Sequence, residues 1–179
     1  MLFRPTQKLA SKIKVGKLVE SALEQNPLAD WSANLLVVNR RQQVLLCNTH
    51  TLFCCLMLAR GITSESKFVE AAILAIEHFL NEEGYSEAIQ KYILPSYSNI
   101  RFRKSLNRSV TGSMTDFIHA AKIHQERTSD LLEVSRKLNV TPMSALRGED
   151  GRNYASPNEA IRLLICQRDR IAQVQASSE

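Results

Sequence analysis

The sequence lacks the long apolar segments that a membrane protein needs. Its longest apolar runs, at residues 44–47 and 52–59, fall well short of the roughly 20 residues that span a bilayer. The opening segment Met1–Pro5 has no basic region followed by an apolar stretch of about 7–15 residues, which a signal peptide requires. We therefore expect a cytoplasmic protein without a membrane segment.

Motifs of the common enzyme classes are also missing. The chain has no Gly-x-Ser-x-Gly elbow, and Gly61, Gly84 and Gly112 are too isolated to form a phosphate-binding loop. The four cysteines form no Cys-x-x-Cys pair, so we interpret them as small buried hydrophobic residues, with a reactive thiol as the alternative. They are Cys47, Cys54, Cys55 and Cys166. The sequence thus offers no catalytic residue and no cofactor motif.

The four histidines do not have the spacing of a metal site. His119 and His124 are five residues apart, so their side chains diverge by more than a right angle on a helix. His78 falls on another predicted helix, and His50 falls in a turn. We expect solvated or core-edge histidines and no bound metal.

Length and charge indicate one globular domain with an uneven charge distribution. At 179 residues and 44% hydrophobic composition, the chain can bury a core, and we expect one domain over residues 1–179. Lys and Arg number 23 and Asp and Glu number 18, which gives a net charge of +5. Residues 65–87 carry six glutamates against one lysine, whereas both flanking stretches are basic. This distribution predicts a polarised surface.

Three apolar runs predict an antiparallel meander over residues 34–58. Short polar groups separate the runs, and parallel neighbours would need a longer crossover. The runs are nearly continuous, so we expect helices on both faces of the sheet. Alternation around Phe102 predicts a fourth strand at residues 99–105 that pairs with the meander. The opening residues Leu2–Arg4 are interpreted as a further short strand.

Helical periodicity follows the meander. Apolar residues recur at helical spacing over residues 66–83, and the glutamates lie largely on the opposite side. Ser113 and Asp116 predict a capping box that opens another helix. A further start signal predicts a C-terminal helix over residues 156–175 that packs on the core. The expected fold is α+β, with an antiparallel sheet of about four strands packed by five or six helices.

Two basic segments are the strongest binding candidates. Arg40 and Arg41 fall in the first hairpin turn, and residues 101–108 hold four basic residues with no acidic residue between Ser96 and Thr115. These four are Arg101, Arg103, Lys104 and Arg108. Arginine forks match carboxylate or phosphate groups, so an acidic protein or a nucleic acid would fit. Charges on a strand edge also block aggregation or form internal salt bridges, and this structural interpretation stays open.

Five further residues are interpreted as structural. Trp31 is the only tryptophan in the sequence, and we expect it in the core with its indole N–H bonded. The asparagines fit the capping of backbone groups at turns and strand ends. The full set is Trp31, Asn34, Asn48, Asn107 and Ser109.

Several uncommon strings occur together along the chain. They are Trp31–Leu35, Arg40–Arg41, Asn107–Met114, Thr141–Leu146 and Ser156–Ala160. In these strings and their order the chain resembles an uncharacterised bacterial domain family over nearly its full length. That family has no established activity, so the resemblance implies no catalytic residue. It implies a small cytoplasmic accessory protein, with mobile or defence-related regions as the expected setting.

We expect a non-enzymatic interaction or accessory module of a bacterial, mobile-element or defence-related system. Its partner would be another protein or a second copy of the chain, with helix 66–83 of one copy facing segment 101–108 of the other. A phosphate-handling enzyme such as a nuclease is the first alternative, with His50 as acid or base beside the arginines of that segment. Weak nucleic-acid binding along the basic strand is the second, less favoured alternative.

Overall fold

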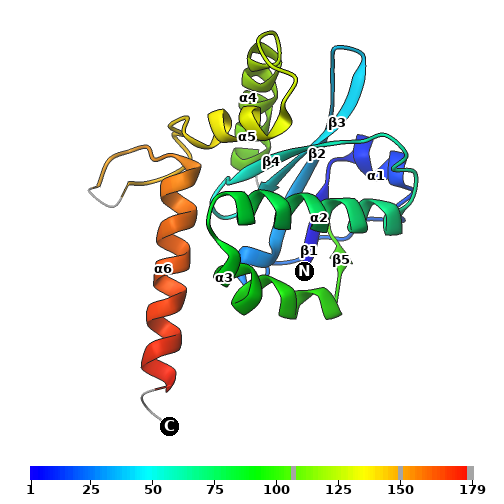
Figure 1. Ribbon diagram of the computed structural model, residues 1–179. Coiled ribbons are helices and arrows are strands. Elements are labelled where there is room, and N and C mark those ends of the chain that lie inside the picture. The colour runs from blue at the N-terminus through cyan, green and yellow to red at the C-terminus, as the bar shows by residue number, and fades with distance from the viewer. Residues whose placement is uncertain (106–107, 149–150, 177–179) are drawn as a thin grey trace.

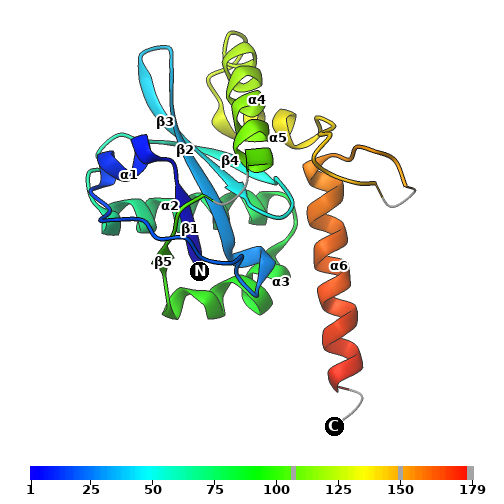
Figure 2. The same cartoon turned by 180° about the vertical axis from the view of Figure 1, so that it is seen from behind.

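A computed structural model describes residues 1–105, 108–148 and 151–176 of the chain (Figures 1 and 2). It contains a five-stranded open sheet and six α-helices. The strands are β1 (Leu2–Pro5), β2 (Asp30–Val38), β3 (Arg41–Asn48), β4 (Cys54–Leu58) and β5 (Arg101–Phe102). The α-helices are α1 (Gln7–Ile13), α2 (Glu65–Glu82), α3 (Ser86–Ala88), α4 (Arg108–His124), α5 (Leu131–Asn139) and α6 (Pro157–Ala176). Shorter 3-10 and π-helical turns are η1 (Pro27–Ala29), η2 (Ile89–Ile93) and η3 (Leu94–Ser98).

The sheet is mixed, with the strand order β4-β3-β2-β1-β5. Strands β2, β3 and β4 form an antiparallel meander, with Trp31 opposite Asn48 and Cys47 opposite Cys54. Strand β1 lies between β2 and β5 and runs parallel to both. The connection from β1 to β2 spans residues 6–29, which is long enough for the crossover that parallel neighbours need.

The meander and the short opening strand are confirmed, but the prediction of a purely antiparallel sheet of about four strands is wrong. The strand predicted at residues 99–105 is also shorter than expected and pairs with β1 instead of the meander. Strand β1 has four residues, too few to show a periodicity, and its partner strands lie far away in the sequence. The local spacing of apolar residues therefore predicts the meander but does not predict the parallel pairing of β1 with β2 and β5.

Helices cover both faces of the sheet, with α2 lying across one of them (Figure 1). That face carries Phe3, Trp31 and Val44 and packs against α1 and α2. The opposite face carries Leu36 and Leu45 and packs against α4 and α5. Because the sheet is buried on both sides, the sequences of its strands are nearly continuous apolar runs.

One predicted helix start is confirmed and one is wrong. Glu159 N donates to Ser156 Oγ at 3.2 Å and Ser156 N donates to Glu159 Oε2 at 2.7 Å, a capping box at the start of α6. The capping box predicted at Ser113 does not form, because α4 begins at Arg108 and Ser113 is buried inside it. The apolar face of α4 extends back to Val110, which lengthens the helix toward its N-terminus.

Helix α5 closes one edge of the sheet. Strand β4 is an edge strand, and two side chains of α5 bond to its backbone. Cys54 N donates to Asn139 Oδ1 at 2.8 Å, and Asn139 Nδ2 donates back to the Cys54 carbonyl at 2.6 Å. Leu56 N donates to Ser135 Oγ at 3.0 Å. Because both α5 side chains are buried, these bonds satisfy edge groups that water does not reach.

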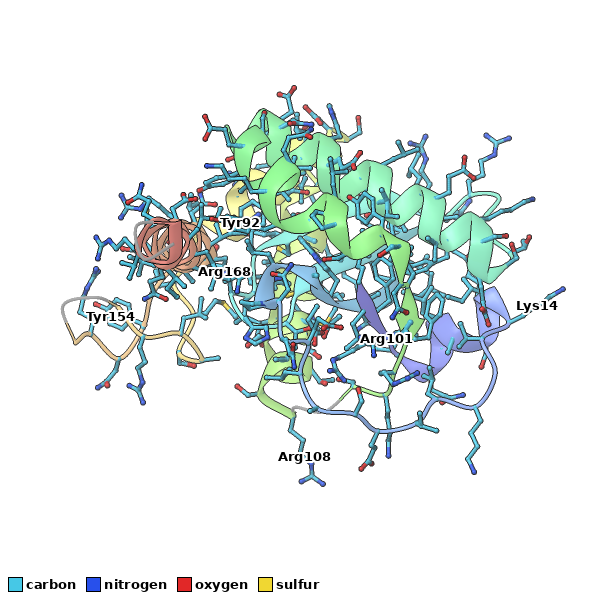
Figure 3. The ribbon with its side chains drawn as sticks, turned by 90° about the horizontal axis from the view of Figure 1, so that it is seen from below. Lys14, Tyr92, Arg101, Arg108, Tyr154 and Arg168 are labelled. Carbon is cyan, nitrogen blue, oxygen red and sulfur yellow. The ribbon has the colours of Figure 1, made fainter. Side chains whose placement is uncertain are left out.

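Helix α6 contacts the body as far as Asp169, and its C-terminal end extends away from it (Figures 1 and 2). Ile161 is fully buried, and Leu164 packs partly against the core. Tyr92 of η2 donates a hydrogen bond to Asp169 at 2.6 Å, and Arg168 lies over the Tyr92 ring (Figure 3). These contacts hold the helix from Ile161 to Asp169, and the described side chains at residues 170–174 lie in solvent.

Candidate functional site

An arginine–aspartate pair lies inside the molecule on the sheet face opposite α2. Arg4 of β1 and Asp30 of β2 are 1% and 0% exposed. Their sequence neighbours Phe3 and Trp31 face α2, so the pair points the other way. Two hydrogen bonds join them, from Arg4 Nε to Asp30 Oδ1 at 2.9 Å and from Arg4 Nη2 to Asp30 Oδ2 at 3.0 Å. Charges this far from water are tolerated when they are paired and bonded in this way.

The segment between α1 and η1 closes over this pair. Arg4 Nη2 donates to the carbonyl of Ala22 at 2.7 Å, and Arg4 Nη1 donates to the carbonyl of Lys104 at 3.0 Å. On the other side, Glu24 N donates to Asp30 Oδ2 at 2.9 Å. The pair therefore fixes both this segment and the chain that follows β5.

The turn after β3 joins the same network. Thr49 Oγ1 donates to Asp30 Oδ1 at 2.8 Å and lies 3.0 Å from Ser32 Oγ. Asn48 Oδ1 accepts the backbone N–H of Thr51 at 3.0 Å, and Asn48 Nδ2 donates to the Asp30 carbonyl at 3.2 Å. Asn48 thus caps backbone groups of the turn and ties the turn to the start of β2.

His50 lies beside this network and is partly exposed. Its backbone N–H donates to Asn48 Oδ1 at 3.2 Å. Partial burial lowers the pKa of the imidazole from its ordinary value, the Asp30 carboxylate raises it and the Arg4 guanidinium lowers it. Burial is thus the main cause of the lowered pKa of His50, and the two charges of the buried pair act on this pKa in opposite directions.

Arg4 and Asp30 escape prediction from the sequence, although both are among the most buried charged residues. The available signal is a single charge beside fully apolar neighbours, since Arg4 follows Leu2 and Phe3 and Asp30 precedes Trp31. That signal identifies a polar position inside a strand. It does not identify the partner, which depends on how β1 and β2 meet.

Part of the basic segment at residues 101–108 is paired within the molecule. Arg101 Nη2 lies 2.6 Å from Glu24 Oε2, and Lys104 Nζ lies 2.9 Å from Glu20 Oε1. Both glutamates come from the segment between α1 and η1, which lies beside β5. These two candidate charges therefore already have acidic partners.

The other candidates of this segment differ in their surroundings. Arg103 Nη1 donates to the carbonyl of Phe102 at 2.8 Å. Arg108, the first residue of α4, points away from the body (Figure 3). Ser109 follows it on the exposed side of the helix. Asn107 lies outside the described residues.

The sheet ends in three arginines that have no such partners. Arg40 lies in the turn between β2 and β3, and Arg41 begins β3. A hydrogen bond from Ala59 N to the Gln42 carbonyl extends the β3–β4 ladder, which places Arg60 beside Arg41. All three are exposed, and none makes an ion pair or a side-chain hydrogen bond within residues 1–105, 108–148 and 151–176. We call these three arginines the basic end of the sheet.

The basic end lies beside an exposed leucine. Arg40, Arg41 and Arg60 line a surface hollow of about 530 Å³ together with Gln42 and Leu58. Leu58 is 51% exposed. The hollow is larger than a single ion needs and combines like charges with an apolar side chain. This combination suits a partner that carries both acidic and apolar groups.

The hairpin turn beside the hollow has a strained backbone. Asn39 and Arg40 have φ angles of 48° and 62°, as a two-residue type I′ turn requires. Asparagine tolerates this left-handed conformation, and glycine is the usual second residue. Arginine in that position costs roughly 1–2 kcal/mol in backbone energy. The fold therefore carries a local cost that presents the Arg40 side chain at the tip of the hairpin.

Two remaining candidates make internal bonds. Trp31 is 1% exposed, and its Nε1 donates to the Leu28 carbonyl at 2.9 Å. Asn34 is half-buried and accepts a hydrogen bond from Thr6 Oγ1 at 3.2 Å. Both residues link β2 to the segments that precede it.

Three of the cysteines are buried, whereas Cys166 is exposed on α6. Burial raises the pKa of Cys55 to about 12, and it also raises the pKa values of Cys47 and Cys54. The expectation of a buried residue is therefore wrong for Cys166, which lies on the solvent side of the last helix. No three His, Cys, Asp or Glu side chains of the described residues are grouped in a way that could hold a metal ion.

The comparison with known proteins assigns the chain to a family. Within the described residues, no helix is both long enough and apolar enough to cross a membrane. None of the curated proteins matches the sequence. A family described as a domain of unknown function, DUF6933, matches residues 2–160, which include the whole sheet and end inside α6. This match covers most of the chain and confirms the resemblance to an uncharacterised domain family. The chain therefore belongs to the DUF6933 family.

Proposed function

We propose that this protein is a non-enzymatic interaction module of a bacterial accessory system and binds an acidic protein partner through the basic end of the sheet. A single observation carries the proposal. Arg40, Arg41 and Arg60 line one hollow and have no carboxylate partner among the described residues. Neighbouring like charges repel each other, so an acidic partner would relieve a repulsion that the fold leaves in place.

The basic end of the sheet is not the binding surface expected from the sequence, which was helix 66–83 together with segment 101–108. Arg101 and Lys104 of the basic segment bond to glutamates of the same molecule. At the C-terminal end of α2, Glu82 and the capping residue Glu83 both bond to Arg136, at 3.3 and 2.7 Å. Since these charges are already engaged, we place the partner at the basic end and not between helix α2 and segment 101–108.

Two features favour a protein partner over a nucleic acid. The side chains that line the hollow include no aromatic ring on which a base could stack. The exposed Leu58 of the hollow gains free energy when another apolar side chain covers it, and a phosphate backbone offers none. Arginine is also enriched at protein interfaces, where its fork and stem contact polar and apolar groups together.

Site-specific photocrosslinking tests this proposal. A photoreactive amino acid replaces Gln42, which is exposed and lines the hollow. The matched control position is Leu74 on α2, which is 60% exposed. We expect a discrete protein adduct from position 42 in lysate of the native host and none from position 74. An adduct of two copies of the chain would identify the partner as the protein itself.

Charge reversal makes the test specific. The variant Arg40→Glu, Arg41→Glu, Arg60→Glu should lose the adduct at position 42. The control variant Lys8→Glu, Lys17→Glu, Lys122→Glu changes the net charge equally at exposed residues outside the hollow and should keep it. An adduct that survives reversal of the three arginines contradicts the proposal, and an adduct removed by nuclease treatment indicates a nucleic-acid partner instead.

A further inference from the structure

A second hollow adjoins the basic end. It shares Arg41 and Leu58 with the first hollow and continues along the sheet toward α5. Its remaining lining residues are Val38, Asn39, Gln43, Gln125, Ser129 and Leu131. The two hollows together form one continuous surface with arginines at one end.

The second hollow is neutral apart from Arg41. Gln43 and Gln125 are buried and satisfy each other, since each amide Nε2 donates to the other's Oε1, at 2.6 and 3.0 Å. They present few free polar groups to a ligand, and Val38 and Leu131 add apolar surface. This hollow therefore suits an apolar side chain, whereas the first hollow suits carboxylates.

We infer that the partner is recognised through a short peptide segment in which acidic residues flank a large aliphatic side chain. The carboxylates lie among Arg40, Arg41 and Arg60, and the aliphatic side chain covers Leu58 and enters the second hollow. This inference rests on the proposed function, because it names the chemistry of the partner at the same basic end.

The three arginines offer planar forks that bind carboxylates with two parallel hydrogen bonds. Their charge alone would attract any polyanion, so the apolar contact supplies the discrimination. Leu58 lies at the shared border of the two hollows, which makes it the residue that a purely anionic ligand would fail to use. Removal of the Leu58 side chain should therefore lower the affinity for the peptide and also its selectivity over a purely anionic ligand.

Fluorescence anisotropy with synthetic probes tests the inference. The first probe is a seven-residue peptide with leucines between glutamates. The second has serines in place of the leucines, the third has glutamines in place of the glutamates, and the fourth is a ten-nucleotide single-stranded DNA. We expect the first peptide to bind at least about fivefold more tightly than the second, which corresponds to partial burial of one leucine. We expect the glutamine peptide to show no binding.

Protein variants separate the two contributions. Leu58→Ser should abolish the preference for the leucine peptide, whereas Leu74→Ser, at a similarly exposed leucine on α2, should retain it. The triple arginine-to-glutamate variant should bind neither acidic peptide. Circular dichroism of each variant checks that the fold is intact.

The outcomes of the two experiments are distinguishable. Equal binding of the leucine and serine peptides, or tighter binding of the DNA, overturns the inference about partner chemistry. If no peptide binds and the adduct at position 42 still forms and depends on the arginines, the inference is wrong and the proposed function stands. If the adduct is also missing, the proposed function is wrong as well.

Discussion

Arg4 and Arg40 are the same residue type in opposite settings. Arg4 is buried, and its guanidinium bonds to the Asp30 carboxylate and to backbone carbonyls. Arg40 is exposed in a strained turn and has no side-chain partner among the described residues. The first arginine stabilises the fold, whereas the second lies where the fold gains nothing from it. The two residues show that bonding, more than residue type, separates an arginine that stabilises the fold from one whose guanidinium has no partner within the described residues.

Loss of Arg4, the buried partner of Asp30, should have the largest effect on the free energy of unfolding. Arg4→Met leaves the Asp30 carboxylate buried with one charged partner fewer, which should lower the free energy of unfolding by about 3–5 kcal/mol. Arg101→Met, which removes a half-exposed salt bridge to Glu24, should cost less than about 1 kcal/mol. Urea unfolding measures both. Similar losses in the two variants would break the distinction between buried and exposed arginines.

The next effect concerns the hydroxyl that supports the buried pair. Thr49→Val removes the bond to Asp30 Oδ1 and should lower the free energy of unfolding by about 1.5–3 kcal/mol, the range for a hydrogen bond to a charged group. The control Thr63→Val changes an exposed threonine and should stay within about 0.5 kcal/mol. An equally small effect at Thr49 would show that the carboxylate does not depend on this donor.

Relief of the strained turn should stabilise the protein. Arg40→Gly removes a left-handed backbone cost of roughly 1–2 kcal/mol but adds unfolded-state entropy, so we expect a net gain of about 0.5–1 kcal/mol. Arg41→Gly, in regular strand, should instead cost about 0.5–1 kcal/mol. Thermal and urea unfolding give both values. A loss of stability in Arg40→Gly would mean that the side chain contributes to the fold after all.

Repulsion between the arginines of the basic end should have a smaller effect on the free energy of unfolding, and this effect should depend on the salt concentration. Arg41→Gln together with Arg60→Gln should raise the free energy of unfolding by about 0.2–1 kcal/mol at low ionic strength, because the two arginines are neighbours across the ladder. The gain should vanish near 1 M salt, where the screening length is about 3 Å. The pair Lys8→Gln and Lys17→Gln serves as the control for net charge. A gain that is equal in both pairs would point to net charge and not to local repulsion.

Titration of His50 should have the smallest effect on the stability of the protein. Since its pKa in the folded state lies below the ordinary value, protonation favours the unfolded state. The contribution of His50 to stability is therefore present above a pH of about 6.5 and is lost as the pH falls through the lowered pKa. NMR titration of the imidazole in the wild type, with His50→Gln as the assignment control, measures the value. A pKa at or above the ordinary value would contradict the described surroundings.

The meander could be predicted because its information is local. Three apolar runs and their short connections specify the antiparallel strands without reference to distant residues. Strand β1 offers four residues and no periodicity, and its parallel partners begin at Asp30 and Arg101. Its place between β2 and β5 depends on which distant segments bury Phe3, which no local pattern records.

The candidate site could be predicted in part for the same reason. Arg40 and Arg41 are adjacent at a recognisable hairpin, Arg40 in the turn and Arg41 at the start of β3, so this pair is visible in the sequence. Arg60 joins them only through the register of β3 and β4, and it looks like an isolated charge in the sequence. Conversely, the dense charges near Arg101 look like a binding segment until the glutamates of a distant loop are placed beside them.

The side chains of Ser135 and Asn139 have a consequence for how molecules of this protein meet each other. They occupy backbone groups of β4 that a strand from a neighbouring molecule would otherwise use. A second copy cannot extend the sheet along this part of β4 without first displacing α5. Edge-to-edge pairing of two molecules through this part of β4 is therefore opposed by two small polar side chains of one nine-residue helix.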